Sequence, residues 1–313
     1  MSYLLQQLVN ALAVGCLYAL IALGYTMVYG VLRLINFAHG DVFMIGAFAG
    51  AYTARALTHD AGQQTLTQAL FGILVAVIVC SIIGWAIERF AYRPLRNSSR
   101  LAALITAIGV SLLIENLANI EWHWGGYRWF GSTPTSYAEI KGSATSIVFF
   151  QQHLGINIVW KDIFLLATTA VVLGILWFIV QYTRRGKAMR AVSQNYDASR
   201  LMGINIDAII SFTFILGSAI AAVGGCLYCL KNPQATPTMG ILIGLKAFVA
   251  AVIGGIGNIA GAAAGGLILG LTETAVSSLG GSRYENAIAF VILIGILLVK
   301  PEGIFGKAVP EKV

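Results

Sequence analysis

Polar and ionisable side chains interrupt the long apolar stretches of this sequence, and six of them could line a route for a polar solute. They are Asn36, His39, Asp41, Glu115, Asn116 and Glu273. An Asp at the centre of a membrane helix costs about 2.5–3.5 kcal/mol on insertion scales, so such groups usually face the interior of a bundle or water. We therefore expect these six residues to line a pathway, with the first three where a helix enters the membrane.

Each of these groups also has a structural alternative. Asn36 can cap the following helix by accepting a hydrogen bond from an orphan backbone amide. Glu115 can contact the ammonium group of a solute, or it can form an interhelical hydrogen bond worth about 0.6 kcal/mol on average. Glu273 can pair with Lys246, whose ammonium group can instead extend to the outer interface.

The sequence lacks the motifs of the common catalytic and nucleotide-binding sites. It has no G-x-x-x-x-G-K-S/T, no H-E-x-x-H, no G-x-S-x-G and no metal-spaced Cys/His cluster. Cys226 and Cys229 form a C-x-x-C within an apolar run, and we interpret both as small apolar filler. The sequence therefore predicts a protein that is not an enzyme, with no metal ion, no cofactor and no nucleic-acid partner. Its energy source must be another chain.

Membrane helices must position these groups. Hydrophobic residues make up 58% of the 313 residues and charged residues only 11%, whereas a soluble chain carries about 25% charged residues. The first apolar run follows no basic segment and precedes no cleavage site, so we expect it to be a spanning helix. Runs of about 20 mainly apolar residues, the length that crosses a bilayer, occur at 8–29, 35–57, 66–90, 101–120, 162–182, 209–230 and 286–300.

A further run, 241–279, is long enough for two passes. It is interrupted at Gly254, Gly255, Gly257 and Asn258, where glycine permits a sharp turn. We expect a hairpin with unequal arms or a re-entrant element, and an all-α bundle of about 8–9 membrane segments that forms one domain over 1–313. Irregular backbone at membrane depth needs cover from protein or a water-filled cavity, so we expect this turn to indicate a pathway.

Basic residues predict the orientation of the bundle. Of the 20 Lys and Arg residues, 13 lie at Arg33 and within 89–100, 184–200 and 300–312, which alternation of the helices puts on one side. The positive-inside rule makes that side cytoplasmic, with the N-terminus outside and the C-terminus inside. The connection 121–161 is then an external loop, whose aromatic residues suit the membrane interface.

The loop 183–208 is then cytoplasmic, and it is basic and helix-prone. Ser193 or Asn195 can cap a helix and Gly203 lies where a helix would end, so we expect two short amphipathic helices. The alternative is a solvated connector that carries topogenic charge. Within it, Asp197-Ala198-Ser199-x-x-x-Gly203 resembles the E-A-A-x-x-x-G loop of ABC importer permeases, with Asp in place of Glu and Ser in place of the second Ala.

Four segments in order extend this resemblance over nearly the whole chain. They are similar to segments of the branched-chain amino-acid ABC permease family, and to its LivH type more than to the longer LivM type. The four are 32–41, 185–204, 254–266 and 300–306.

The resemblance implies a role for the loop 183–208. In that family it forms a coupling helix that docks on the ATPase subunit. The residues of this sequence to which the role would fall are Arg190, Asp197, Ala198, Ser199, Arg200 and Gly203.

The resemblance also implies partners and a substrate. The partners are a second, LivM-like permease subunit, two cytoplasmic ATP-binding cassette subunits and an extracytoplasmic solute-binding protein, in or at the inner membrane. The substrates are Leu, Ile and Val, with urea, amides or other amino acids as alternatives. A self-sufficient secondary carrier or channel is the competing class. It would fit a duplication of the Gly/Ala-rich segments 35–50 and 246–266, but it needs no cytoplasmic lever.

Overall fold

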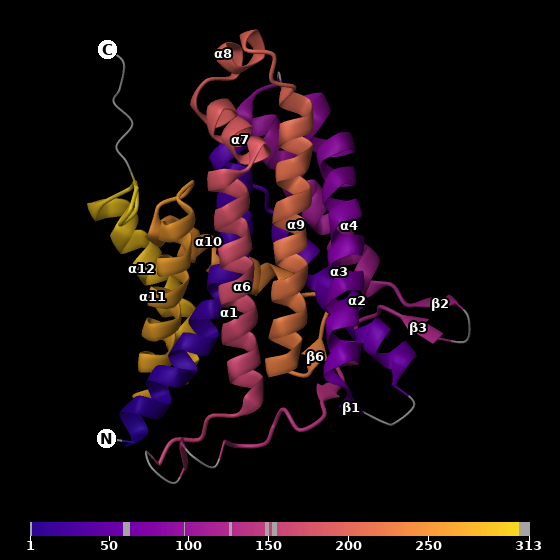
Figure 1. The fold of residues 1–313 in the computed structure, drawn as a ribbon, viewed down its shortest axis with the longest axis vertical. Helices are drawn as coiled ribbons and strands as arrows, with labels where there is room; N and C mark the ends of the chain where they lie inside the picture. The colour runs from indigo at the N-terminus through magenta and orange to yellow at the C-terminus, as the bar shows by residue number, and fades with distance from the viewer. Residues whose placement is uncertain are drawn as a thin grey trace.

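The computed structural model describes residues 2–58, 63–96, 98–124, 127–147, 150–151 and 155–306. The tail lysines Lys307 and Lys312, which contribute to the predicted orientation, lie outside these ranges. The described part is a bundle of long helices (Figure 1), seven of which are long and apolar enough to cross a membrane. Its helices are α1 (Ser2–Leu32), α2 (His39–Leu57), α3 (Leu66–Ala86), η1 (Ile87–Tyr92), η2 (Arg93–Leu95), α4 (Arg100–Asn119), α6 (Trp160–Tyr182), α7 (Arg184–Gln194), α8 (Tyr196–Leu201), α9 (Ile206–Lys231), α10 (Met239–Gly254), α11 (Ile259–Ser278), η3 (Ser282–Tyr284) and α12 (Glu285–Val299).

Short strands lie at the end of the bundle opposite α7 and α8 (Figure 1). We call these two ends the strand end and the α8 end. The chain begins at the strand end, and its described part finishes towards the α8 end. The strands are β1 (Gln63–Gln64), β2 (Trp122–Trp124), β3 (Tyr127–Trp129), β4 (Thr135–Ser136), β5 (Glu139–Ile140) and β6 (Gln234–Ala235). They form three two-stranded pairs, β1 with β5, β2 with β3 and β4 with β6.

The aromatic residues of the loop 121–161 divide between two environments. Phe130 packs on Phe48 with a ring-centroid distance of 5.0 Å, and Trp129 packs on Tyr52 at 4.8 Å. These two cover the end of α2, because an α-helix of this length leaves its last aromatic side chains without neighbours in the bundle. Trp122 is exposed, as expected at a membrane interface, and the side chains of Trp124 and Tyr127 lie outside the described residues.

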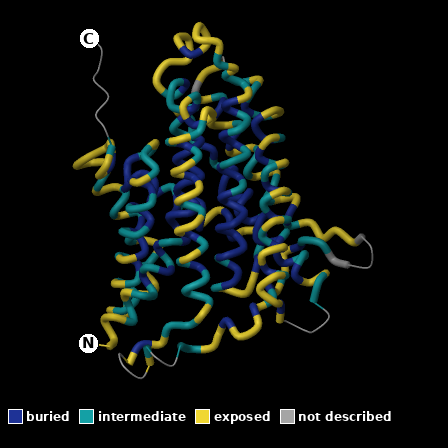
Figure 2. Tube along the Cα trace, viewed as in Figure 1, coloured by how far each residue is buried: buried dark blue, intermediate teal, exposed yellow. Residues whose placement is uncertain are grey.

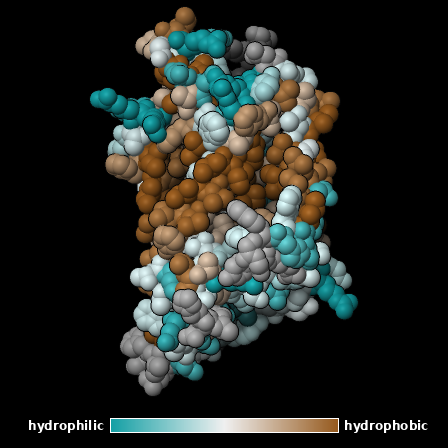
Figure 3. All heavy atoms as spheres, turned by 90° about the vertical axis from the view of Figure 1, so that its right-hand side faces the viewer, coloured by the Kyte–Doolittle hydropathy of each residue, from teal (hydrophilic) through white to brown (hydrophobic). Residues whose placement is uncertain are grey.

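An apolar belt surrounds the bundle. Figure 3 shows it as a hydrophobic band across the middle of the molecule, between more polar ends. Large exposed apolar side chains supply it, among them Leu113 on α4, Phe178 on α6 and Leu298 on α12. Side chains of this kind and number remain exposed only where the surrounding solvent is lipid or a partner covers them. The molecule is therefore a polytopic membrane bundle.

The helix expected at 35–57 is present as α2, but it starts four residues later, at His39. The chain reverses at Arg33, whose φ is 54°, and only at His39 does α2 begin. His39 lies against Gly24 of α1, eight residues before the end of that helix at Leu32, which is about 12 Å along its axis. Residues 33–38 thus lead the chain back into the bundle, and α2 starts inside it.

A second half-helix starts at the same place. Residues 232–238 return from the end of α9, and α10 begins at Met239. Gly240 packs directly on Gly40, so that a Cβ atom on either glycine would collide with the carbonyl oxygen of the other. Only glycine permits this approach, and the N-termini of α2 and α10 therefore meet inside the bundle.

From this junction the two half-helices run in opposite directions. Gly50, near the end of α2, lies against Tyr137 and Cys226 at the strand end. The turn after α10 brings Gly257 against Gly30, near the end of α1 and the α8 end. Each half of the molecule thus has a long helix, a half-helix and two further long helices, in inverted orientation: α1 to α4 and α9 to α12.

Four residues of α2 recur at equivalent positions of α10, at a spacing of 200 residues. The matching pairs are Gly40 with Gly240, Ala47 with Ala247, Phe48 with Phe248, and Ala51 with Ala251. At this spacing the segment that corresponds to α2 is α10, Met239–Gly254, which overlaps the expected segment 246–266 only in part. The expected pairing followed Gly/Ala content, which small-residue packing produces in many helices.

The glycine-rich interruption at 254–258 is a turn between α10 and α11. Gly255 and Gly257 have φ values of 95° and 97°, and Asn258 caps α11 by accepting a hydrogen bond from the Gly261 amide at 3.2 Å. The Phe305 amide donates to the Gly254 carbonyl, so the C-terminal segment covers the turn. The hairpin prediction is confirmed, and irregular backbone also precedes α2 at 33–38 and α10 at 232–238.

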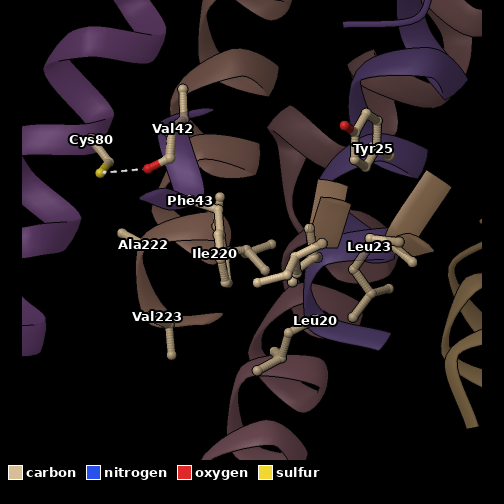
Figure 4. Packing of buried hydrophobic residues seen from close by; sticks show 14 of the residues in the cluster. Leu20, Leu23, Tyr25, Val42, Phe43, Cys80, Ile220, Ala222 and Val223 are labelled. Carbon is tan, nitrogen blue, oxygen red and sulfur yellow. Dashed lines mark hydrogen bonds between the residues drawn. The ribbon is translucent and has the colours of Figure 1, made fainter. Parts of the chain in front are cut away.

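The core lies where α1, α2 and α9 cross. Figure 2 shows the buried segments gathered along the bundle axis, and Figure 4 shows Leu20 and Leu23 of α1, Phe43 of α2 and Ile220 of α9 packed together. All four are buried. Close packing of this kind fixes α2 and α10 in place, because both helices are surrounded by other helices of the bundle.

Candidate functional site

A small cavity lies at the junction of the two half-helices. It measures about 170 Å³, and α2, α4 and α10 contribute most of its lining. Asp41 enters it from the first turn of α2, while Ser111 and Glu115 face it from successive turns of α4. The structure thus brings together Asp41 and Glu115, two residues 74 positions apart in the sequence. We call this cavity the junction pocket.

Asp41 is the buried polar group with the least local support. Its residue is only 1% exposed, neither carboxylate oxygen forms a hydrogen bond of good geometry within the described residues, and the Ser111 hydroxyl is the side-chain donor close enough to interact with it. A buried carboxyl without a partner is costly. The Asp41 carboxyl is therefore stabilised either by nearby positive dipoles or by a ligand that binds to it.

Asn36 and His39 are buried behind the junction pocket and not in its lining. The Tyr92 hydroxyl lies 3.0 Å from Asn36 Oδ1 and donates to it. Ala38 is the N-cap of α2 and provides no side-chain cap, so the alternative that Asn36 caps this helix was wrong. His39 packs edge-on against Tyr25 at 4.6 Å, and its Nε2 has no hydrogen-bond partner in the described part of the chain.

Asn116 lies apart from the other five residues. Its side chain is exposed, and its Nδ2 donates back to the Leu112 carbonyl at 2.7 Å. This is the usual local bond of a polar side chain on a helix surface. Asn116 follows Glu115 in the sequence but faces about 100° away from it around the helix.

Glu273 forms a buried ion pair. Lys246 Nζ lies 3.0 Å from Glu273 Oε1, and the Tyr18 hydroxyl donates to Glu273 Oε2 at 2.7 Å. Both charged side chains are almost completely buried. The ion pair left open by the sequence is therefore present, and the extension of Lys246 to the interface was wrong, because Glu273 and Tyr18 satisfy the ammonium group inside the bundle.

The ion pair forms the floor of a larger cavity at the strand end. This cavity measures about 730 Å³ and lies between the start of α1 and the ends of α9 and α11. Gln7, Asn10 and Asn232 give it a polar wall. It is separate from the junction pocket, since the two share no lining residue.

Two short helices form the loop expected at 183–208. Thr183 caps α7 by accepting from the Gly186 amide at 3.1 Å, and Asn195 caps α8 by accepting from the Ala198 amide at 3.0 Å. Gly203 follows with a φ of 78°, the left-handed conformation that ends a helix. Of the two caps considered in the sequence, Asn195 is the one used.

Side-chain contacts fix this loop to the bundle. The Tyr196 hydroxyl donates to the Val31 carbonyl at 2.8 Å, and Arg33 donates to the Ser193 carbonyl at 3.2 Å. Arg190 donates to the Val180 carbonyl at the end of α6. Burial raises the pKa of Tyr196, so its hydroxyl stays protonated and remains a donor.

The tip of α8 is exposed. Asp197, Ala198 and Arg200 are exposed, whereas Ser199 is buried and donates to the Asn195 carbonyl at 2.7 Å. Leu201 is 88% exposed and Met202 is 82% exposed. These two large apolar side chains are thus uncovered at the end of the molecule where α8 lies (Figure 1).

A buried charge network beside this loop was not singled out from the sequence. Glu88, fully buried in the π-helical segment η1, accepts from Arg96 and from Ser211 of α9. Asp207, in the first turn of α9, pairs with both Arg93 and Arg96. The signal was present, since Glu88 directly precedes the arginines of 89–100 and Asp207 lies at the end of the loop 183–208.

The cysteines behave as apolar side chains. All four thiols are free, and Cys80 Sγ and Cys226 Sγ each lie 3.4 Å from a backbone carbonyl, that of Val42 and that of Gly46 (Figure 4 for Cys80). Within the described residues, no three His, Cys, Asp or Glu side chains converge as metal ligands.

Comparison with known proteins gives one family over nearly the full length. The family model described as the permease component of branched-chain amino acid transport systems matches residues 7–297. The chain is 39% identical to the high-affinity branched-chain amino acid transport system permease protein LivH of Escherichia coli (strain K12), over 99% of this chain and 98% of the relative. It is 40% identical to the permease protein BraD of Pseudomonas aeruginosa, with the same coverage. The ribose import permease RbsC of Escherichia coli (strain K12) is 34% identical over 39% of this chain and 40% of its own length.

Proposed function

Because this chain belongs to the branched-chain amino acid transport system permease family, we propose that it translocates Leu, Ile and Val across the inner membrane, driven by ATP that other subunits hydrolyse. As a member of that family it is a multi-pass transport subunit of the inner membrane and not an enzyme. The relatives that cover the full chain are named for branched-chain amino acids, which favours these substrates over urea, amides or other amino acids.

The α8 end faces the cytoplasm in this proposal. The basic residues of η1, η2, α7 and α8 gather at that end, and so does the last described residue, Gly306. The positive-inside rule then puts the N-terminus and the strands outside. With α2 and α10 added to the seven long helices, the bundle has nine membrane segments, two of which start inside it.

The observation that carries the coupling role is the exposed tip of α8. Leu201 and Met202 extend from the cytoplasmic end with no cover from the chain, and large exposed apolar side chains of this kind mark a docking surface. We assign this surface to a cleft on an ATP-binding cassette subunit. Asp207 and Glu88 would transmit movement of α8 to α9 and α3 through Arg93 and Arg96.

The remaining partners follow from the same assignment. A second, LivM-like permease subunit would lie against the exposed apolar faces of the bundle, two ATP-binding cassette subunits would bind on the cytoplasmic side, and a solute-binding protein would dock at the strand end. Asp41 and Glu115 would line the pathway, Asn36 and His39 would support it from behind, and Glu273 would face the outer cavity.

Reconstitution of the complete transporter in liposomes tests the proposal. We expect ATP-dependent uptake of radiolabelled leucine that isoleucine and valine compete and urea does not. Leu201→Asp should abolish uptake and the copurification of the ATPase subunits, because a carboxylate cannot enter an apolar cleft without loss of its hydration. Wild-type uptake by this variant would remove the docking assignment.

Leu279→Asp is the matched control. Leu279 is 87% exposed, almost as much as Leu201, but it lies at the opposite end of the bundle. We expect this variant to copurify with the ATPase subunits like the wild type. Equal loss of copurification in both variants would mean that any exposed apolar side chain has this effect, and the α8 tip would have no special role.

A further inference from the structure

The junction pocket has two features that point to one ligand chemistry. The first is Asp41, which is buried, faces the pocket and forms no hydrogen bond of good geometry within the described residues. Glu115 adds a second carboxyl to the same wall and Ser111 adds a hydroxyl between them. Two acidic groups without a basic residue in the pocket lining form a site for a cation that can donate hydrogen bonds.

The second feature is the N-terminus of α10. Gly240, Ile241 and Gly244 line the pocket, and Thr238, the N-cap, offers no side-chain acceptor to the first-turn amides. Helix N-termini carry a partial positive charge and free N–H groups, and they bind carboxylates and phosphates. The Met239 and Ile241 amides already donate to the Thr236 and Thr238 carbonyls, which leaves the Gly240 amide as the first-turn donor for a carboxylate.

The rest of the lining is apolar or aromatic. Ile108 and Leu112 of α4 and Leu245 of α10 form one side, and Tyr25 and Phe37 form the other. A ligand in this pocket therefore meets acidic groups, a helix N-terminus and an aliphatic wall within one volume of about 170 Å³.

We propose that the junction pocket binds the zwitterionic head group of an α-amino acid, with Asp41 and Glu115 on its ammonium group and the N-terminus of α10 on its carboxylate. The proposal rests on the transport function above, and it identifies the residues that recognise amino acids as a class. The aliphatic wall receives the side chain. The pair of Lys246 and Glu273 cannot serve in this way, because each charge already has its partner.

The test measures protection of a thiol in the pocket. Cys16→Ser first removes the one native thiol that is not buried. Ser111→Cys then introduces the reporter thiol. The transporter, assembled without its binding protein, is labelled with a maleimide. Three probes are compared: leucine, leucinamide, which lacks the carboxylate, and 4-methylpentanoate, which lacks the ammonium group. We expect leucine to protect about 10–100-fold more effectively than either analogue, the range for one charge-assisted hydrogen bond.

Asp41→Asn then identifies the ammonium partner. In this variant the advantage of leucine over 4-methylpentanoate should fall towards one, while its advantage over leucinamide remains. Glu115→Gln should reduce the same advantage to a smaller extent. Asn116→Ala, next in the sequence but facing outwards, is the control and should change neither ratio.

Each outcome bears on one claim. Equal protection by the three probes, or an Asp41→Asn variant with unchanged ratios, overturns the zwitterion site even if the wild-type transporter takes up leucine. Absence of ATP-driven leucine uptake in the wild type contradicts the proposed function instead. If Asp41→Asn does not assemble, the three-probe comparison in the Ser111→Cys protein and the Glu115→Gln ratio still decide the matter.

Discussion

The half-helices α2 and α10 start at the same junction, but their buried charged residues have different partners. Both begin at the contact of Gly40 with Gly240, and each carries a charged residue into the interior, Asp41 on α2 and Lys246 on α10. On α10, Lys246 has Glu273 and Tyr18 as partners from two other helices. On α2, which also buries His39, neither carboxylate oxygen of Asp41 forms a hydrogen bond of good geometry within the described residues. An unpaired buried charge lowers the stability of the fold. We therefore infer that Lys246 stabilises the fold through its ion pair, whereas Asp41 is retained to bind a ligand.

The largest effect is expected from Glu273→Gln. Removing one partner of a buried ion pair leaves the other charge uncompensated and costs about 3–5 kcal/mol. We expect a large fall in the thermal unfolding midpoint of the detergent-solubilised transporter. Lys246→Met combined with Glu273→Gln should recover most of it, because the variant then has no unpaired charge.

Asp41→Asn provides the contrast. This substitution removes a charge that has no partner, so the unfolding midpoint should stay the same or rise. A fall as large as that of Glu273→Gln would contradict the distinction between a structural pair and a ligand-binding carboxyl.

An intermediate effect is expected at the junction of the half-helices. Gly40→Ala and Gly240→Ala each place a methyl group against the facing carbonyl oxygen, and such overpacking costs about 1–3 kcal/mol. Similar losses of stability in both variants would support the equivalence of α2 and α10. Gly109→Ala on α4 is the control, since a Cβ atom there meets no neighbour within 4 Å. A loss confined to one of the two junction variants would break the comparison.

The smallest effect is expected at the caps of the helices that follow. Thr65 caps α3 after α2, and Asn258 caps α11 after α10. Loss of a cap costs about 1 kcal/mol, so Thr65→Ala should lower stability by about this amount. Asn258→Ala should lower it slightly more, because Asn258 also donates to the Phe305 carbonyl at 3.1 Å. A chemical denaturation series on both variants measures the difference.

The sequence was sufficient for the long helices and the short helical loop. Runs such as 162–182 are apolar for the full width of a bilayer, and α6 spans Trp160–Tyr182. The two helices of the loop 183–208 and the cap at Asn195 followed from local residue preferences. These features depend on neighbours within one or two turns, which the sequence displays directly.

The half-helices could not be predicted in this way. The runs 8–29 and 35–57 predicted a connection between them, but the depth at which α2 begins depends on a reversal at Arg33 and on glycines 200 positions apart that must meet. The junction pocket has the same origin. Asp41 and Glu115 were both selected from the sequence, but their proximity, and the separation of Asn116 and Glu273 from them, depends on how α2, α4 and α10 pack.

The exposed pair Leu201 and Met202 has a consequence for the life of the protein before assembly. In the proposed orientation, a chain that has not bound an ATPase subunit keeps these two side chains in contact with cytoplasmic water. An orphan copy is therefore marked for chaperones and proteases, which recognise uncovered apolar side chains. Matched synthesis of permease and ATPase thus decides how many transporters accumulate, and production of the permease on its own should give low yields.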